Sequence, residues 1–191
     1  MTPLPSVTIV VVPRDRFCYT QESLESIIEY TDYPYHLVYV DAGSPQHIRK
    51  YLQQRSLEKQ FELIRNDHYL SPNRARNLGL KRINTDYVVF IDNDVIVSRG
   101  WLKALVDCAQ ETGCAVVCPL TCQDKPVHEC IHYAGGEVSI EEVDRCGVHE
   151  RHLIEKMYLQ DKKLPQVRDQ LRRASNGFTE FHCFFAQAEI F

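Results

Sequence analysis

The chain has 191 residues, of which 44% are hydrophobic and 25% are charged, and its formal net charge at pH 7 is -4. This length suits a single domain with a sizeable core, and the slightly acidic balance argues against a nucleic-acid partner, which would need a broad basic surface. The longest apolar runs are only strand-sized and no signal-peptide pattern follows Met1, so we expect a cytoplasmic protein without a membrane span.

Strand-like and helix-like segments alternate along residues 1–120. Short runs rich in β-branched and aromatic residues predict the strands Val7–Val12, His36–Val40, Phe61–Ile64, Tyr87–Ile91 and Ala115–Pro119. Amphipathic spacing and capping residues predict the helices Thr20–Thr31, Gln46–Lys59, Pro72–Ile83 and Trp101–Thr112. Such alternation is typical of an α/β fold with a mostly parallel sheet flanked by helices.

The segment after Thr121 is less regular. The sequence predicts a turn at Ala134–Gly136, a charged helix over His149–Leu164 and a strand over Phe178–Phe185. The chain ends on the apolar pair Ile190 and Phe191, so we expect a truncated domain.

The strongest functional signal is the strand Tyr87–Ile91, which runs directly into Asp92, Asn93 and Asp94. Extended backbone would place the two carboxylates on one face, because strand side chains alternate. Two close carboxylates suit a hard divalent cation such as Mg²⁺ or Mn²⁺, with phosphate oxygens on its far side. An acidic turn that merely ends a core strand is the alternative for this motif taken alone.

Polar residues also follow the other predicted strands. Pro13 and Arg14 follow the first strand, Asp41 the second and Asn66 the third. In parallel α/β sheets, ligands bind beyond the carboxyl ends of the strands. We therefore predict that these residues share one edge of the sheet with the Asp92–Asp94 motif.

Eight cysteines raise the question of a zinc site, because five of them cluster near two histidines: Cys108, Cys114, Cys118, Cys122, Cys130, His128 and His132. Structural zinc sites usually contain a closer cysteine pair than this cluster offers. Buried thiols are the favoured interpretation, and disulfides are not expected without a secretion signal.

These motifs together resemble family 2 glycosyltransferases of the GT-A fold, which is Rossmann-like. The resemblance is carried by Pro13, Asp41, Asn66, the helix segment Asn73–Leu80 with its Ala-Arg-Asn-Leu-Gly sequence, and Phe90–Asp94. It covers residues 6–120 well and the rest more weakly. It implies one GT-A domain over residues 1–191, with a nucleotide-sugar-binding half at 1–120 and the start of an acceptor half at 121–191.

The resemblance also implies an activity. The protein would be a metal-dependent, inverting hexosyltransferase that moves a sugar from a nucleoside-diphosphate sugar to a hydroxyl of an unidentified glycan, lipid or protein. The implied nucleotide-sugar ligands are Pro13, Arg14, Asp41, Asn66, Arg76, Asp92 and Asn93. The implied ligands of Mn²⁺ or Mg²⁺ are Asp92, Asp94 and, as a secondary candidate, His182. The catalytic base is not identified, because Glu180 and Glu189 do not lie in the family's usual context.

Each of these residues also has an ordinary structural interpretation. Asp41 suits an Asx-turn, Arg76 a solvated helix charge and His182 a partly buried histidine without a special role. Two other functions stay open: a donor-binding module without turnover, and a haloacid-dehalogenase-like phosphatase. The phosphatase motif usually ends the first strand and is followed by Thr, whereas here it ends the fourth and Val95 follows.

Overall fold

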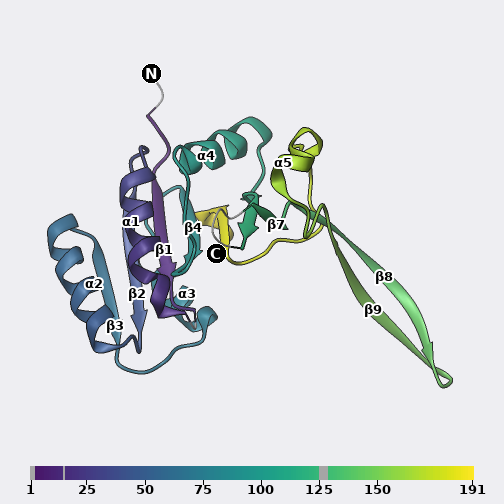
Figure 1. Ribbon diagram of the computed structural model, residues 1–191, viewed down its shortest axis with the longest axis horizontal. Helices are drawn as coiled ribbons and strands as arrows, with labels where there is room; N and C mark the ends of the chain where they lie inside the picture. The colour runs from purple at the N-terminus through teal and green to yellow at the C-terminus, as the bar shows by residue number, and fades with distance from the viewer. Residues whose placement is uncertain (1–2, 15, 125–128) are drawn as a thin grey trace. The chain divides into compact units, whose positions relative to one another are not determined.

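The computed structural model describes residues 3–14, 16–124 and 129–191, which form two compact units (Figure 1). The sheet unit comprises the residues up to Val117 together with Phe181–Phe191. The hairpin unit comprises Cys118–Glu180. The last residues of the chain thus belong to the same unit as its first residues.

A six-stranded sheet in the order β3-β2-β1-β4-β10-β5 forms the centre of the sheet unit. Its strands are β1 (Val7–Val12), β2 (His36–Ala42), β3 (Glu62–Asn66), β4 (Tyr87–Asp92), β5 (Val116–Val117) and β10 (Cys183–Gln187). Strands β1 to β4 pair in parallel, whereas β10 lies antiparallel between β4 and β5. The expected mostly parallel α/β sheet is therefore confirmed, with one antiparallel strand that the sequence pattern did not indicate.

Helices cover both faces of this sheet. They are α1 (Thr20–Tyr30), α2 (Gln46–Lys59), α3 (Pro72–Leu80) and α4 (Trp101–Thr112), with short 3₁₀ turns η1 (Phe17–Tyr19) and η3 (Ala188–Ile190). One apolar cluster joins α1, α2 and α4 to the face that includes Ile9. A second cluster joins α3 to the face that includes Val10. Consecutive residues of β1 thus serve opposite cores, which explains why the strand is apolar throughout.

Helix α3 lies unusually close to the sheet. A Cβ atom added to Gly79 would stand 2.2 Å from Cγ1 of Val10. Real Cβ contacts are never this short, so only glycine allows the helix to approach β1 at this depth.

The strand register brings the predicted polar residues to one edge. Val12 pairs with Asp92 and Asp41 pairs with Arg65, both at the carboxyl ends of their strands. Because β10 runs antiparallel to β4, its first residue, Cys183, pairs with Ile91. His182 therefore reaches the same edge from the amino end of its strand.

The hairpin unit contains two antiparallel strand pairs and little helix. Its elements are β6 (Thr121–Gln123), β7 (Cys130–Tyr133), β8 (Gly136–Arg145), β9 (Val148–Met157), α5 (Leu164–Val167) and η2 (Arg168–Gln170). β6 pairs with β7, and β8 pairs with β9 over ten residue pairs. Within this unit the β8–β9 hairpin extends as a separate arm (Figure 1).

Two sequence predictions in this part of the chain are wrong. The expected helix over 149–164 is largely strand β9, because Cys146 and Gly147 adopt φ values of 56° and 82°. A two-residue turn with both φ values positive matches the twist of a hairpin and pairs β9 with β8. The expected strand over 178–185 begins only at Cys183, where pairing with β4 begins.

No helix in the described ranges is both long enough and apolar enough to cross a membrane.

Candidate active site

Asp92 is the centre of a charged cluster at the carboxyl edge of the sheet. Its side chain is fully buried, at 0% exposure, as the last residue of β4. Its Oδ1 atom lies 3.2 Å from Nη2 of Arg76, and its Oδ2 atom lies 3.5 Å from Nε of Arg14 and 3.2 Å from Nδ1 of His182. Burying a carboxylate is costly unless it is paired, and here three basic side chains surround it.

Arg76 reaches Asp92 from helix α3 and is itself buried. Its Nη1 atom donates to Oδ1 of Asn73 at 3.0 Å, and its Nη2 atom also donates to the carbonyl oxygen of Phe181 at 3.1 Å. The guanidinium lies over the Phe181 ring, 5.0 Å from its centroid. Burial lowers the pKa of Arg76 and the charge of Asp92 opposes that shift. The interpretation of Arg76 as a solvated helix charge is therefore wrong.

One donor of Arg76 stands out. Among the described residues, its buried Nε–H has no hydrogen-bond partner. Buried donors of this kind are rare in folded proteins and usually meet a water or a ligand.

Asn93 holds the loop after β1 against the end of β4. Its Oδ1 atom accepts from the backbone N–H of Arg14 at 2.8 Å, and its Nδ2 donates to Oγ1 of Thr20 at 3.1 Å. Its own N–H donates to the carbonyl oxygen of Val12 at 2.9 Å. Pro13 is buried in the same loop. These bonds favour a role for Asn93 in positioning Arg14, and its predicted contact with nucleotide-sugar stays a prediction.

Asp94 lies beside Asp92 and is half-buried. Burial and the negative charge of Asp92 raise the pKa of the Asp94 carboxyl, whereas His182 and Arg14 lower it. The net upward shift indicates that the protein's own cations are committed mainly to Asp92. Asp94 is thus the carboxylate of the motif that gains most from an added cation.

A second cluster surrounds Asp41, which is 1% exposed in β2. Its Oδ2 atom accepts from Nη1 of Arg65 at 2.5 Å and from Oγ of Ser44 at 2.9 Å. Its Oδ1 atom accepts from the backbone N–H of Ser44 at 3.3 Å. The N–H of Gly43, which an Asx-turn would use, donates instead to the carbonyl oxygen of Asn66, so the expected Asx-turn into Gly43 is not formed. Arg65 was not singled out from the sequence, because an alternating strand pattern does not show which charge faces a neighbouring strand.

Asn66 joins the loop after β3 to the turn after β2. Its carbonyl oxygen accepts from the N–H of Gly43 at 3.0 Å, and its Oδ1 accepts from the N–H of His68 at 2.9 Å. Gly43 has a φ of +76°, and a Cβ there would lie 3.0 Å from the backbone nitrogen of Tyr69. The turn therefore requires glycine both for its conformation and for this close approach.

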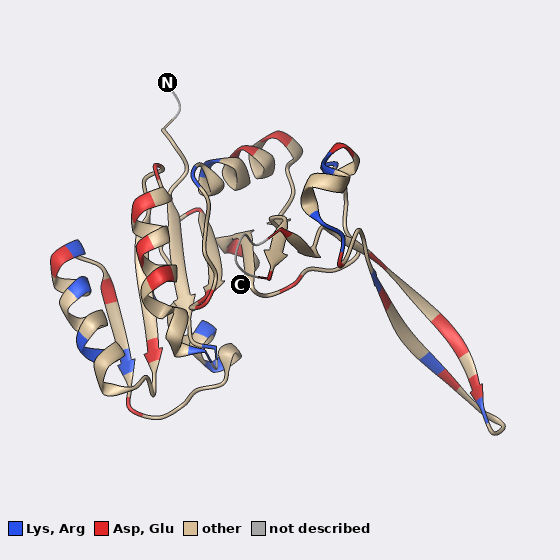
Figure 2. Cartoon of the chain, viewed as in Figure 1, with Lys and Arg blue, Asp and Glu red and all other residues tan. Residues whose placement is uncertain are grey.

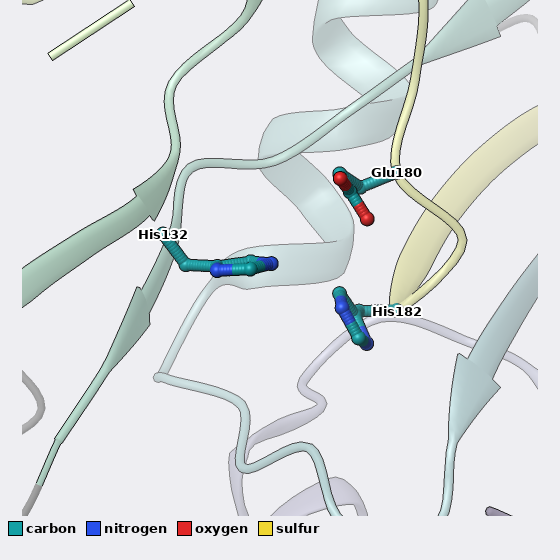
Figure 3. A group of neighbouring side chains, drawn as sticks. All are labelled: His132, Glu180 and His182. Carbon is teal, nitrogen blue, oxygen red and sulfur yellow. The ribbon is translucent and has the colours of Figure 1, made fainter. Parts of the chain in front are cut away.

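His182 joins the sheet unit's site from the residue before β10. Besides the ring contact, its carbonyl oxygen accepts from the N–H of Asp92 at 2.9 Å. In the hairpin unit, ligand atoms of His132 and Glu180 lie within 4.8 Å of each other. Figure 3 labels these two side chains and His182. The sequence offered His182 only as a secondary metal ligand, and His132 only as a neighbour of the cysteine cluster.

One hollow of the sheet unit lies away from this edge. It has a volume of about 430 Å³ and is lined at the amino ends of β2 and β3 by residues that include His36, Lys59 and Glu62. None of the predicted site residues lines it.

The eight cysteines are all free thiols in the structure. In the parts of the chain that the structure describes, no group of three candidate metal ligands includes a cysteine. His128, named with the cysteine cluster, lies outside the described residues.

Comparison with known proteins decides the family. The model for glycosyl transferase family 2 matches residues 8–135, which include all the polar clusters after β1 to β4. The chain belongs to glycosyl transferase family 2. The expected membership of a family 2 glycosyltransferase is thus confirmed, on the residues that suggested it.

The curated glycosyltransferases that the chain matches are longer than the chain. The pre-mycofactocin glycosyltransferase of Mycobacterium tuberculosis is 40% identical over 59 residues, which is 31% of this chain and 13% of that protein. An uncharacterized glycosyltransferase of Haemophilus influenzae is 27% identical over 103 residues, which is 53% of this chain and 32% of that protein. The chain therefore spans a third or less of these relatives.

Solved glycosyltransferase structures share the fold. A Pyrobaculum calidifontis mannosyltransferase in complex with GDP-Man and Mn²⁺ has a TM-score of 0.54 and 22% identity, over 65% of this chain and 37% of that one. GalNAc-T7 with UDP, GalNAc and Mn²⁺ has a TM-score of 0.60 and 17% identity, over 98% of this chain and 36% of that one. The expected GT-A fold is therefore confirmed.

Proposed function

We propose that this chain binds a nucleoside-diphosphate sugar and a divalent cation at the carboxyl edge of its sheet, as part of an inverting glycosyltransferase. The observation that carries the proposal is the cluster in which Arg14, Arg76 and His182 surround the buried carboxylate of Asp92. Family membership supplies the reaction class. The GDP-Man in the related mannosyltransferase structure, and the UDP in the GalNAc-T7 structure, support a donor of this kind.

The side chains present fit a divalent cation. Asp94 has a raised pKa and gains from an added positive charge. A histidine that ligates a metal usually directs its other ring nitrogen at a carboxylate, and Nδ1 of His182 faces Asp92 in this way. We therefore assign Asp94 and His182 as the main metal ligands, with Asp92 orienting His182. Oxygen and imidazole ligands together suit Mn²⁺ better than Mg²⁺, which prefers oxygen alone.

Basic side chains of the same edge would hold the donor. Arg14 is 43% exposed at the side chain and is the accessible cation nearest to Asp92. The buried Nε–H of Arg76 offers a donor to an acceptor such as a phosphate oxygen. Asp41 and Asn66, at the ends of β2 and β3, would face the nucleoside, with Arg65 holding Asp41 in place.

In the reaction, an acceptor hydroxyl would form a bond to the anomeric carbon as the bond from that carbon to the diphosphate breaks. A bound cation would neutralise the charge that builds on the leaving diphosphate. The hydroxyl proton would pass to a base that we do not assign to any described residue. Glycan, lipid and protein acceptors all stay open.

Binding of the donor is the step to test first. Isothermal titration of GDP and UDP is expected to show binding with Mn²⁺ and at least about tenfold weaker binding with EDTA, since a diphosphate and carboxylates repel without a cation between them. Asp94→Asn should remove the Mn²⁺ dependence. Asp32→Asn is the matched control, because Asp32 is exposed before β2, at the other edge. Equal affinity with and without EDTA would contradict the metal assignment.

A donor-binding role without turnover is separated by product formation. If nucleotide binds with Mn²⁺ but a sugar is never released from the donor in the presence of candidate acceptors, the binding proposal stands and the transferase proposal fails for residues 1–191.

A further inference from the structure

The outer edge of β9 is unusually open for a strand of its length. β8 and β9 form a two-stranded sheet, so each strand has a hydrogen-bonded neighbour on one side only among the described residues. An isolated two-stranded hairpin has marginal stability in water, and an unpaired strand edge is a template for another strand. The arm would therefore gain stability from a further strand, and its outer strand edges offer the backbone groups with which such a strand can pair.

Apolar side chains at the middle of the arm are exposed. Ile140 and Leu153 lie directly opposite each other and are 57% and 63% exposed. Val148 is 57% exposed near the turn. Because these side chains gain from being covered, a partner strand is expected to lie across the middle of β9.

The charges of β9 are arranged symmetrically about Leu153, with opposite signs. Glu150 and Arg151 precede it by three and two positions, and Glu155 and Lys156 follow it by two and three positions. Reversing the strand about Leu153 therefore brings Arg151 onto Glu155 and Glu150 onto Lys156. A strand with this pattern is complementary to an antiparallel copy of itself.

The charges of β8 are not complementary to an antiparallel copy of β8. It carries Glu137, Glu141, Glu142 and Asp144 against the single cation Arg145 (Figure 2). Two β8 strands side by side would place like charges together, which disfavours pairing. The charges thus distinguish the two edges of the arm.

We propose that two copies of this chain associate through β9, edge to edge and antiparallel, with Leu153 opposite the partner's Leu153. Arg151 then lies opposite the partner's Glu155, and Glu150 opposite the partner's Lys156, each pair occurring twice by symmetry. Because the outward-facing N–H and C=O groups of an edge strand alternate, the nearest other registers slide the partner by two residues. These registers place the partner's Leu153 opposite Arg151 or opposite Glu155, and the attractive pairs are lost. The charges therefore select one register among its nearest alternatives.

Charge reversal tests this register. Sedimentation equilibrium, in reducing buffer because Cys146 is exposed, is expected to show a dimer of the wild-type chain. Glu155→Arg should weaken dimerisation at least about tenfold, because two attractive cross-strand pairs become repulsive. Glu155 lies opposite Val138 in its own hairpin, so this change introduces no like-charge pair within the arm. Arg145→Glu on β8 is the control and should leave the dimer intact.

Mixing two variants separates pairing from misfolding. Arg151 lies opposite Glu142 in its own hairpin, so Arg151→Glu is combined with Glu142→Arg to keep that pair attractive. This double variant should also be monomeric alone, but an equimolar mixture with Glu155→Arg restores two complementary pairs per dimer and should recover association. Glu150→Lys, at a position opposite Val143, should behave like Glu155→Arg. Its rescue uses Lys156→Glu combined with Glu137→Lys, because Lys156 forms an ion pair with Glu137 in its own hairpin. A wild-type chain that stays monomeric at all concentrations, a dimer unaffected by Glu155→Arg, or mixtures that stay monomeric would each overturn the proposal.

Discussion

Nδ1 of His182 lies 3.2 Å from Oδ2 of Asp92, although 90 residues separate them along the chain. The backbone repeats the connection, because the N–H of Asp92 donates to the carbonyl oxygen of His182 at 2.9 Å. The histidine is therefore fixed to the end of β4 through both its main chain and its ring. A ring held in this way is oriented before any ligand arrives.

His182→Ala should weaken Mn²⁺-dependent binding of a nucleoside diphosphate by at least about tenfold, because it removes an assigned ligand. Calorimetric titration with Mn²⁺ and with EDTA measures the effect. His36→Ala provides the control, since His36 is exposed at the start of β2, away from the site. Unchanged affinity in the His182 variant would exclude it as a ligand.

Arg76→Ala should lower the free energy of unfolding by about 1.5–3 kcal/mol, because Asp92 loses a charge-assisted hydrogen bond while it stays buried. Arg76→Lys keeps the charge but loses the fork that spans Asp92 and the carbonyl of Phe181, so an intermediate loss is expected. Urea denaturation measures both. Arg74→Ala, an exposed position on the same helix, should change stability by less than about 0.5 kcal/mol. Equal effects at the two arginines would refute the assigned ion pair.

Asp94→Asn should raise the melting temperature near pH 7 in EDTA. The pKa of Asp94 is raised by burial and by Asp92, so the folded chain binds this proton more tightly than the unfolded chain does. The ionised carboxylate therefore costs stability as pH rises from the unfolded pKa of about 3.9 through the higher folded pKa. The advantage of the variant should shrink as pH falls through that window. With Mn²⁺ present the order should reverse, since only the wild type gains a bound cation. A variant that is less stable in EDTA would contradict the raised pKa.

Gly43→Ala should destabilise the fold by more than Gly113→Ala does. Both glycines have positive φ values, +76° and +69°, so both substitutions carry a backbone penalty of about 1–2 kcal/mol. Only at Gly43 does the new Cβ also press on the backbone of Tyr69, whereas Gly113 has open space. The difference in melting temperature between the two variants measures the cost of the contact with Tyr69. Equal losses would show that the turn can move away from Tyr69.

The sequence predicted the parallel part of the fold closely because its signals are local. The bounds of α2 and α4 agree with the expected ones, and α4 ends at Gly113, which has positive φ at the C-cap. Strand β10 was misjudged because its limits depend on pairing with β4, about 90 residues away along the chain. For β9, the local signal for a hairpin is the turn at Cys146 and Gly147, and the high charge content of residues 149–164 instead favoured an exposed helix.

The sequence predicted which residues lie at the site, but it did not predict which of them contact each other. The residues after β1 to β4 do share one edge, as the parallel register requires. The sequence did not indicate that Arg76 is buried, or that Arg65 pairs with Asp41, because neither feature has a local periodicity. Burial of a charge depends on what packs above it, and for Arg76 that residue is Phe181.

Because Gly79 has no side chain, helix α3 lies close to the sheet, and this position sets how near Arg76 comes to Asp92. Helix α3 rests on Val10 at a depth that even one extra carbon would prevent. Arg76 lies one turn earlier on the same helix, and with the helix at that depth its guanidinium lies 3.2 Å from the carboxylate of Asp92. A methyl group at position 79 would act as a spacer between helix and sheet, and the charged cluster would open although none of its own members had changed.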